Sequence, residues 1–397
     1  MASSNPAGSL LKPCVKCRAQ EATLDSRSQA VCRDCFTKFI AAKCIKQIGL
    51  LAKETPTPHY GQPRRFVVGL SLGPCSAALV HLLNENVDFQ LARSRPAPFT
   101  ITAVYVDPHP ARKAEDDILE GYRQRYPRFT FKRDDDDGKL DAMLNSLPSA
   151  ASRSDIVRLL TRHILLAEAV SHDAQALLLG HSTTALAELT LAETAKGRGF
   201  SLPWVMRDGV VDVVVSRPPS SSLTSSPSPN QPALLPPPKE TKTKKMLIYH
   251  PLRDALRKEL ITYLSLVDNP PPLLTTHIHH TADNDKADKK VVSHKDLSID
   301  EVMIRYFADV EKEYPSVVAN VARTTGKLVR LLSGDSSSSQ KLCGLCGAPL
   351  DESGDERWRG ELGIQIQEED HGEGEDGSGS GNKKGGVCYG CERSVRG

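Results

Sequence analysis

The chain has 397 residues, 39% apolar and 25% charged, a balance typical of a globular protein with some disordered stretches. No apolar run approaches the roughly 20 residues that span a bilayer, which argues against a membrane protein. Residues 1–14 lack the basic and apolar segments of a secretory signal, so a cytosolic protein is expected. The net charge of +2 combines −9 over residues 351–376 with +11 elsewhere. This asymmetry suits a polyanionic partner, or an ordinary mixed surface beside one acidic loop.

Two cysteine pairs mark residues 1–60 as a first module. Cys14 and Cys17 form one C-x-x-C pair, Cys32 and Cys35 form a second, and fourteen residues separate the pairs. Tetrahedral zinc takes four such ligands, so the spacing predicts a structural zinc site followed by a helix. An iron–sulfur cluster or a redox dithiol uses the same pattern and stays open as an alternative.

Residues 61–217 alternate between strand-like and helix-like stretches. Strands are expected at Phe66–Leu70, Phe99–Val106, Arg128–Phe131, Ala174–Leu179 and Val210–Ser216, and helices at Ser76–Asn84, Glu115–Tyr126, Ser154–Val170 with Ser154 as N-cap, and from Thr183 or Thr184. This alternation predicts an α/β fold with a mostly parallel sheet covered by helices on both faces. The loops at Ser71 and Gly180 should then lie beyond the carboxyl ends of neighbouring strands, where such sheets bind ligands.

The next 118 residues contain two stretches without apolar periodicity. Residues 218–245 are interpreted as a disordered Ser/Pro insertion, and 269–290 as a polar insertion whose His277, His279 and His280 are exposed rather than metal-binding. The segment 246–335 otherwise supplies a strand at Met246–Tyr249, a helix to Leu266 and helices at Ser298–Glu313 and Ser316–Leu332. The charge run Asp134–Asp137 is expected to be a solvated loop.

Residues 336–397 hold the second pair of knuckles. Cys343 and Cys346 precede Cys388 and Cys391 by a long interval that is acidic and Gly/Ser-rich over 351–386. Loop-closure entropy grows only slowly with length, so this insertion is compatible with a second structural zinc site. The alternative is two unconnected cysteine pairs in a flexible tail.

The loop after the first strand of the α/β segment resembles a phosphate-binding loop. Ser71-Leu-Gly-Pro-Cys-Ser76 is similar to the S-G-G-x-D-S pattern of the PP-loop ATP pyrophosphatases. Leu72 and Cys75 replace a glycine and an aspartate, which crowds the approach to phosphate and removes a carboxylate. Ser71, Gly73, Ser76, Gly180 and His181 are therefore expected to form a degenerate nucleotide site.

Taken together, these pieces resemble the cytoplasmic tRNA 2-thiolation protein 2 family, the degenerate PP-loop (Rossmann-like) partner of the tRNA wobble-uridine thiolase. The match is carried by the loop, Leu179–Thr184, Lys196–Gly199, His250–Arg253 and the terminal cysteine pairs. Active relatives have a G-H-N-x-D-D-x-A-E-T run, and the same register here, from Gly180 to Leu189, lacks both aspartates. No cysteine lies between Cys75 and Cys343, so the thiolates that active thiolases place in the pocket are missing.

The resemblance implies a subunit of a cytosolic thiolase complex rather than an independent enzyme. Its catalytic PP-loop partner would use ATP and any iron–sulfur cluster, and would take sulfur from the thiocarboxylated ubiquitin-related modifier. The product would be the 2-thiolated wobble uridine, as in 5-methoxycarbonylmethyl-2-thiouridine, of the lysine, glutamine and glutamate tRNAs. Two alternatives stay open: a self-sufficient ATP-dependent sulfurtransferase with Cys75 as sulfur relay, and a zinc-bearing scaffold that binds proteins.

Contacts to tRNA would come from basic side chains that meet phosphates. The set expected near the mouth of the sheet or beyond it is Arg64, Arg65, Lys196, Arg198, Arg253, Arg257 and Lys258. Each could equally be an ordinary surface charge.

Overall fold

The computed structural model describes residues 12–56, 62–107, 114–135, 143–216, 241–274, 297–329, 342–348, 350 and 386–396. Residues 218–240, Asp136, Asp137 and the three histidines His277, His279 and His280 lie outside the described residues, as does most of the expected insertions at 269–290 and 351–386.

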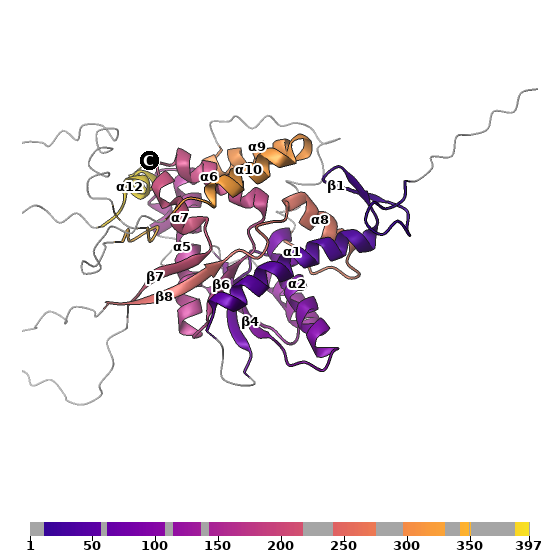
Figure 1. Ribbon diagram of the computed structural model, residues 1–397. Coiled ribbons are helices and arrows are strands. Elements are labelled where there is room, and N and C mark those ends of the chain that lie inside the picture. Colours follow the sequence, from indigo (N-terminus) through magenta and orange to yellow (C-terminus); the bar gives the residue numbers. More distant parts are fainter. Residues whose placement is uncertain are drawn as a thin grey trace, which may run out of the picture.

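A six-stranded sheet forms the centre of the molecule (Figure 1). Its strands are β3 (Arg64–Gly69), β4 (Phe99–Asp107), β5 (Thr130–Asp135), β6 (Ala176–Leu179), β7 (Gly209–Ser216) and β8 (Thr241–Tyr249). Their order is β5-β4-β3-β6-β8-β7, and only β7 runs antiparallel to its neighbour. The mostly parallel α/β sheet predicted from the sequence is confirmed.

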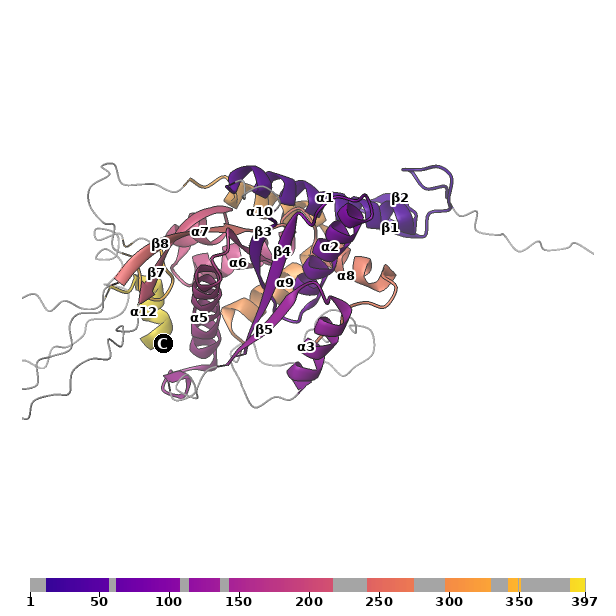
Figure 2. The ribbon, with the colours of Figure 1, turned by 90° about the horizontal axis from the view of Figure 1, so that it is seen from below.

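Helices cover both faces of this sheet. They are α1 (Arg33–Glu54), α2 (Pro74–Leu91), α3 (Ala114–Arg125), α5 (Ala150–Ser171), α6 (Thr183–Ala195), α7 (Leu202–Val205), α8 (Arg257–Leu266), α9 (Ile299–Glu313), α10 (Pro315–Thr325) and α12 (Tyr389–Arg396), with a 3-10 turn at Gly199–Ser201. Figure 2 shows strands β3 to β5 with α5 on one side and α2 and α3 on the other.

The alternating directions of the side chains along β3 explain why a hydrophobic core forms on each face of the sheet. Successive strand side chains point to opposite faces, so Phe66 and Val68 join the core beneath α1, α2 and α8, while Val67 joins the core beneath α5. Helices α6, α9 and α10 form a further layer in which Leu186 and Phe307 are buried. None of the described helices is long and apolar enough to cross a membrane.

The N-terminal module consists of a short hairpin, β1 (Leu24–Ser26) and β2 (Gln29–Val31), and the first turn of α1. Cys32 is the N-cap residue of α1, and the Cys14 knuckle lies beside the hairpin through the hydrogen bond from the Val15 N–H to the Ala30 carbonyl. Hairpin, knuckle and helix start thus bring the four cysteines together.

Several expected boundaries are wrong, and the structure gives a reason for each. Helix α5 begins at Ala150 rather than Ser154, because Ser149 takes the extended N-cap conformation and its Oγ accepts the Ser152 N–H at 3.0 Å. Asp134 lies in β5 opposite Val106 instead of in a loop. The expected insertion 218–245 is too long at its end, because Thr241 to Lys245 pair with β7 and belong to β8.

Candidate functional site

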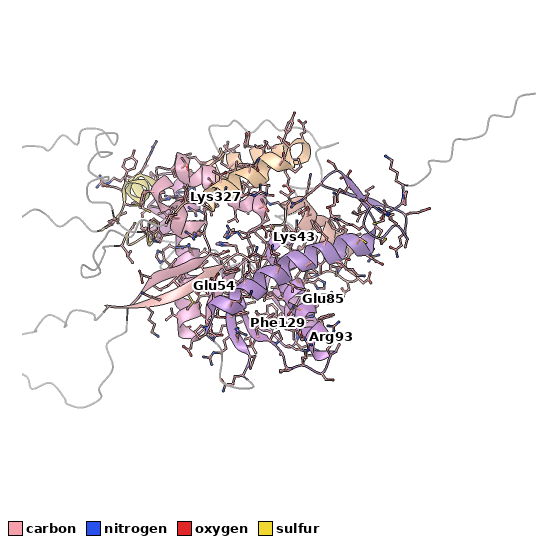
Figure 3. All side chains as sticks on the ribbon, viewed as in Figure 1. Lys43, Glu54, Glu85, Arg93, Phe129 and Lys327 are labelled. Atoms are coloured by element: carbon pink, nitrogen blue, oxygen red, sulfur yellow. The ribbon has the colours of Figure 1, made fainter. Side chains whose placement is uncertain are left out.

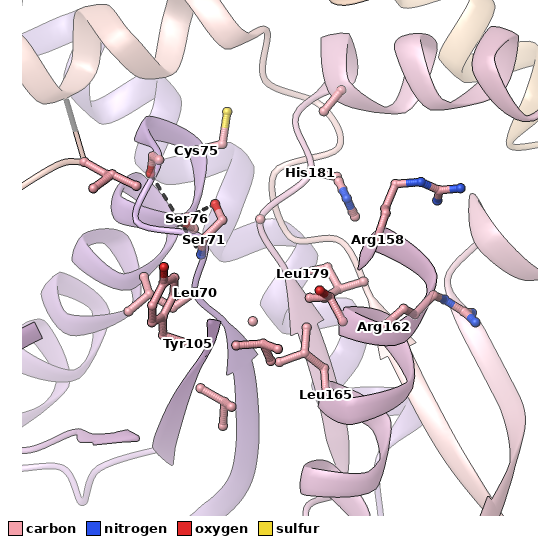
Figure 4. A pocket seen from close by; sticks show the side chains of 18 of the residues that line it. Leu70, Ser71, Cys75, Ser76, Tyr105, Arg158, Arg162, Leu165, Leu179 and His181 are labelled. Carbon is pink, nitrogen blue, oxygen red and sulfur yellow. Dashed lines mark hydrogen bonds between the residues drawn. The ribbon is translucent and has the colours of Figure 1, made fainter. Parts of the chain in front are cut away.

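A cavity of about 720 Å³ lies where β3, β4 and β6 end, at the carboxyl edge of the sheet. Ser71 and Tyr105 line it from the β3 and β4 side, and His181 lines it after β6. Arg158 and Arg162, one turn apart on α5, form the opposite wall (Figure 4). The order of the strands reverses between β3 and β6, which is the point at which open α/β sheets bind ligands. We therefore take this cavity as the candidate site.

The loop after β3 is closed on itself by its own hydroxyl groups. The Ser71 N–H donates to the Ser76 Oγ at 3.2 Å, and the two serine hydroxyls lie 3.1 Å apart. The Ser76 hydroxyl also donates to the Gly73 carbonyl at 3.1 Å. A loop that cradles phosphate needs its N–H groups and hydroxyls to point at the ligand. Here three of these polar groups are already bonded within the loop.

Leu72 fills the position at which the PP-loop pattern has its first glycine. Its backbone is left-handed, with φ of +56°, a conformation that costs a residue with a Cβ roughly 1–2 kcal/mol. The side chain is fully buried in the core beneath α2, and the carbonyl accepts the Leu274 N–H at 3.0 Å. Core packing thus holds a leucine in a glycine conformation, and the segment at Leu274 is hydrogen-bonded to the loop.

Gly180 allows the loop after β6 to touch the loop after β3. A Cβ at Gly180 would lie 2.9 Å from the Ser76 Cα and 3.1 Å from its backbone nitrogen. No larger residue fits without a shift of backbone. The two loops expected at neighbouring strand ends are therefore in direct contact.

Two histidines lie side by side at the cavity: His181, which lines it, and His250, which is fully buried. The rings of His181 and His250 have centroids 5.3 Å apart, and Asp208 accepts both the backbone N–H and the Nδ1 of His250 at 2.8 Å. Burial, followed by the positive charges of neighbouring residues, lowers the pKa of His181 to about 3. His181 is therefore a neutral imidazole at physiological pH and adds no positive charge to the cavity.

The helix α6 shows what occupies the register of the missing acidic pair. Thr184 lies at one aspartate position, where its hydroxyl donates to Glu311 at 3.1 Å and accepts the Arg257 N–H at 2.9 Å. Ala185 lies at the other and lines the cavity. The Glu188 carboxylate, which the active pattern also has, binds the Arg257 guanidinium through both oxygens. These residues join α6 to α8 and α9 instead of supplying free carboxylates.

Cys75 is the single cysteine among the described residues that line the cavity. Burial raises the pKa of its thiol, and the nearby Arg257 and Ser182 offset this only in part. The reactive form of cysteine is the thiolate, so the environment of Cys75 disfavours nucleophilic chemistry.

Each group of four cysteines forms a compact cluster. The four sulfur atoms of each group lie within 4.8 Å of one another, and the groups are Cys14, Cys17, Cys32 and Cys35, and Cys343, Cys346, Cys388 and Cys391. Zinc–sulfur bonds of about 2.3 Å place two tetrahedral ligands about 3.8 Å apart. The Sγ atoms of Cys17 and Cys32 are 3.8 Å apart, and those of Cys346 and Cys388 are 3.7 Å apart. Both clusters therefore fit a four-coordinate zinc ion, which would be closed to substrates.

Comparison with known proteins agrees with this arrangement. The family model described as cytoplasmic tRNA 2-thiolation protein 2 matches residues 298–393. The protein of that name from Pyrenophora tritici-repentis is 34% identical over 97% of this chain and 94% of its own length. The one from Phaeosphaeria nodorum is 30% identical over 96% and 94%. The chain belongs to the cytoplasmic tRNA 2-thiolation protein 2 family.

A solved structure supports the fold. The U34-tRNA thiolase NcsA from Methanococcus maripaludis, solved with its 4Fe–4S cluster, aligns with a TM-score of 0.52 at 16% identity. The alignment covers 85% of this chain and 92% of that one. The family member described here thus shares the PP-loop architecture that its sequence predicted.

The basic residues expected to face RNA do not share one surface. Lys196 and Arg198 are buried, and Arg198 has no exposed surface. Its guanidinium binds Glu193 at 2.8 Å, Asp155 at 2.7 Å and the Ser394 hydroxyl at 2.9 Å. The expectation that Lys196 and Arg198 contact RNA is wrong, because their charges are already neutralised inside the protein.

The other five expected residues fall into two groups. Arg64 and Arg65 begin β3 and therefore lie at the opposite end of the strand from the cavity, where Arg64 binds Thr55 and Arg65 pairs with Asp173. They do not lie at the mouth of the sheet, and an RNA contact by them stays a prediction. Arg253, Arg257 and Lys258 do lie on the cavity side, and they are bound to Asp208, Glu188 and the Glu311 carbonyl respectively. An RNA contact by these three stays a prediction.

Sequence reasoning missed the acidic partners of the buried cations. Asp155 accepts the Lys196 ammonium and the Arg198 guanidinium at 2.7 Å each, and Arg158 on the cavity wall also pairs with it. These partners lie 41 and 43 positions apart along the chain. No local pattern marks Asp155, which shares its helix face with Ser152 and Arg158.

Proposed function

We propose that this chain is the non-catalytic subunit of a cytosolic tRNA thiolase complex that converts the wobble uridine to its 2-thio form. Family membership supports the pathway, and the loop after β3 supports the division of labour. The decisive observation is the loop itself, in which Leu72 fills a glycine position and Ser71 and Ser76 bond one another. A complete fold with a spoiled phosphate loop still supplies surfaces for a partner and for RNA.

In this proposal the chemistry takes place in a catalytic PP-loop partner. ATP adenylates the O2 of the wobble uridine, and sulfur from the thiocarboxylated ubiquitin-related modifier displaces the adenylate. Any iron–sulfur cluster belongs to the same partner, as do the steps on the lysine, glutamine and glutamate tRNAs. The chain described here contributes no thiolate to those steps, because Cys75 is a neutral thiol, and Thr184 and Ala185 replace the acidic pair of the active pattern.

Reconstitution tests the proposal directly. The purified chain, its PP-loop partner and an equimolar mixture are each incubated with ATP, sulfur donor and a tRNA transcript that carries uridine at the wobble position, and thiolation is followed by retardation in a mercury-containing gel. Activity should appear in the mixture alone and should survive Cys75→Ala within about twofold, since this thiol is not a reacting group.

Two other outcomes would contradict the proposal. Activity of this chain without the partner, lost in Cys75→Ala, would indicate a self-sufficient sulfurtransferase. Full activity of the partner without this chain would leave the chain a protein-binding scaffold.

A further inference from the structure

The N-terminal module carries several basic side chains that take no part in the contacts described above. Between Lys12 and Glu54 the sequence has nine Lys and Arg residues against four Asp and Glu, a local charge of +5 in a chain whose net charge is +2. Some of these cations point inward: Arg27 and Lys43 bind the Glu259 carboxylate of α8 at 2.7 and 3.2 Å. Several of the others lie along the outside of α1.

The outer side of α1 is a stripe of three lysines and two small residues, which we call the lysine face. Lys38, Ala42, Lys46, Gly49 and Lys53 are all exposed. With 3.6 residues per turn they fall within about 80° of the helix circumference. The helix has 22 residues, so it is about 33 Å long, and it lies on the outside of the molecule, where Lys43 and Glu54 mark its course (Figure 3). Within the described chain, none of the three lysines forms an ion pair.

Gly49 gives independent support for a ligand that contacts the lysine face. A glycine inside a helix destabilises it by about 1 kcal/mol relative to alanine. Nothing lies within 4 Å of the position that a Cβ would take at Gly49, so packing within the chain gives no reason for it. Gly49 has no side chain and Ala42 has only a methyl group, so a ligand between the lysines can approach the helix backbone closely.

We propose that the lysine face binds the phosphate backbone of tRNA, an inference that rests on the proposed function. Phosphate contacts are made chiefly by lysine and arginine and need no particular base. The acidic residues of α1 are confined to its two ends, Asp34 and Glu54, so the central part is purely cationic. The core of a protein–protein interface is depleted of lysine, which makes a polyanion the better occupant, although Ile45 beside the stripe is 43% exposed.

The test compares two triple variants of the full-length chain. Lys38→Gln, Lys46→Gln and Lys53→Gln together remove the charge of the lysine face and keep good helix formers. Lys244→Gln, Lys245→Gln and Lys327→Gln remove three exposed charges, two from β8 and one just after α10, and serve as the matched control. Binding of a wobble-uridine tRNA transcript is followed by fluorescence anisotropy over a range of KCl concentrations.

The lysine-face variant should bind tRNA about tenfold or more weakly, and the slope of log K against log salt should fall by about two, since each lost phosphate contact removes about 0.7 to 0.9. The control variant should match the wild type. Equal affinities and slopes in the two variants would overturn the inference. So would unchanged tRNA binding with loss of co-purification of the PP-loop partner, which would make the lysine face a protein interface.

The thiolation assay of the wild-type mixture separates this inference from the proposed function. If that mixture thiolates tRNA while the lysine-face variant binds tRNA normally, only the inference fails. If the mixture is inactive, the proposed function fails whatever the variant does.

Discussion

Gly390 shows how closely the C-terminal knuckle contacts the rest of the protein. A Cβ at this position would lie 2.3 Å from the Cγ of Arg198 and 2.8 Å from the Lys196 carbonyl. Because the Arg198 guanidinium is held by Asp155 and Glu193, it has little freedom to withdraw. We expect Gly390→Ala to lower the free energy of unfolding by about 1–3 kcal/mol through overpacking. Urea unfolding followed by circular dichroism measures this difference.

Gly49→Ala is the matched control for that substitution. The added methyl group meets open space, so only the helix propensity changes, and stability should rise by up to about 1 kcal/mol. Equal effects of the two alanine substitutions would contradict the tight contact at Gly390.

Asp155 carries the buried charge cluster that holds the knuckle in place. Burial alone would raise the pKa of this carboxyl, but Arg198, followed by Lys196 and Arg158, holds it well below its ordinary value of 3.8. Asp155→Asn leaves buried cations without compensation, and we expect a loss of roughly 3–5 kcal/mol in unfolding free energy at neutral pH.

The pH dependence of that loss follows from the direction of the shift. A carboxyl with a lowered pKa in the folded state stabilises above its ordinary pKa, and this stabilisation is lost as the pH falls below it. The stability difference between wild type and Asp155→Asn should therefore be full at pH 7 and should shrink below pH 3.8. A difference that stays constant over this range in urea titrations would show that folding does not lower the pKa of Asp155.

At the scale of elements, the strands and helices with clear apolar periodicity are the ones that the sequence predicts well. Strand β4 and helix α6 start where their patterns begin, at Phe99 and Thr183. Some errors occur where a distant partner decides the boundary: β8 extends back to Thr241 because it pairs with β7 across a gap in the described chain. A local pattern contains no information on such pairing.

The two cysteine clusters dock on different elements. The N-terminal module reaches α8 through Arg27 and Glu259, whereas the C-terminal knuckle reaches α5, where Arg162 donates to the Cys346 carbonyl at 3.4 Å and His163 contacts the Leu345 carbonyl. The folding free energy that metal binding supplies at each cluster should therefore stabilise a different neighbouring element.

Hydrogen exchange measures this difference. Cys343→Ser with Cys346→Ser should speed amide exchange in α5 and in the loop around Arg198, and Cys14→Ser with Cys17→Ser should speed it in residues 12–35 and α8. The second pair of substitutions should also lower the folded yield before it lowers thiolation by the complex. Identical exchange patterns in the two variants would contradict separate docking.

For the whole molecule, motif reasoning located the cavity but did not show that Lys196 and Arg198 of the expected RNA patch are buried, for one physical reason. The loops at Ser71 and Gly180 follow strands whose order in a parallel sheet places their ends together. A basic residue gives no such guarantee, because its partner can come from anywhere: Arg257 binds Glu188 from 69 positions away, and Arg65 binds Asp173 from 108. Surface cations can be separated from buried ones only when the fold is known.

The closed loop leads to a last prediction for the complete chain. A ligand that binds only the folded state stabilises it by RT ln(1 + [L]/Kd), about 2.7 kcal/mol at a hundredfold excess over Kd. Because Ser71, Gly73 and Ser76 bond one another and Leu72 occupies the glycine position, magnesium–ATP should leave the Tm of the isolated chain unchanged. The PP-loop partner, measured in the same scan, should show a rise that grows with ATP concentration. Such a rise in this chain, abolished by Ser71→Ala, would mean that the loop opens to bind phosphate and that the division of labour between the two subunits is less complete than proposed.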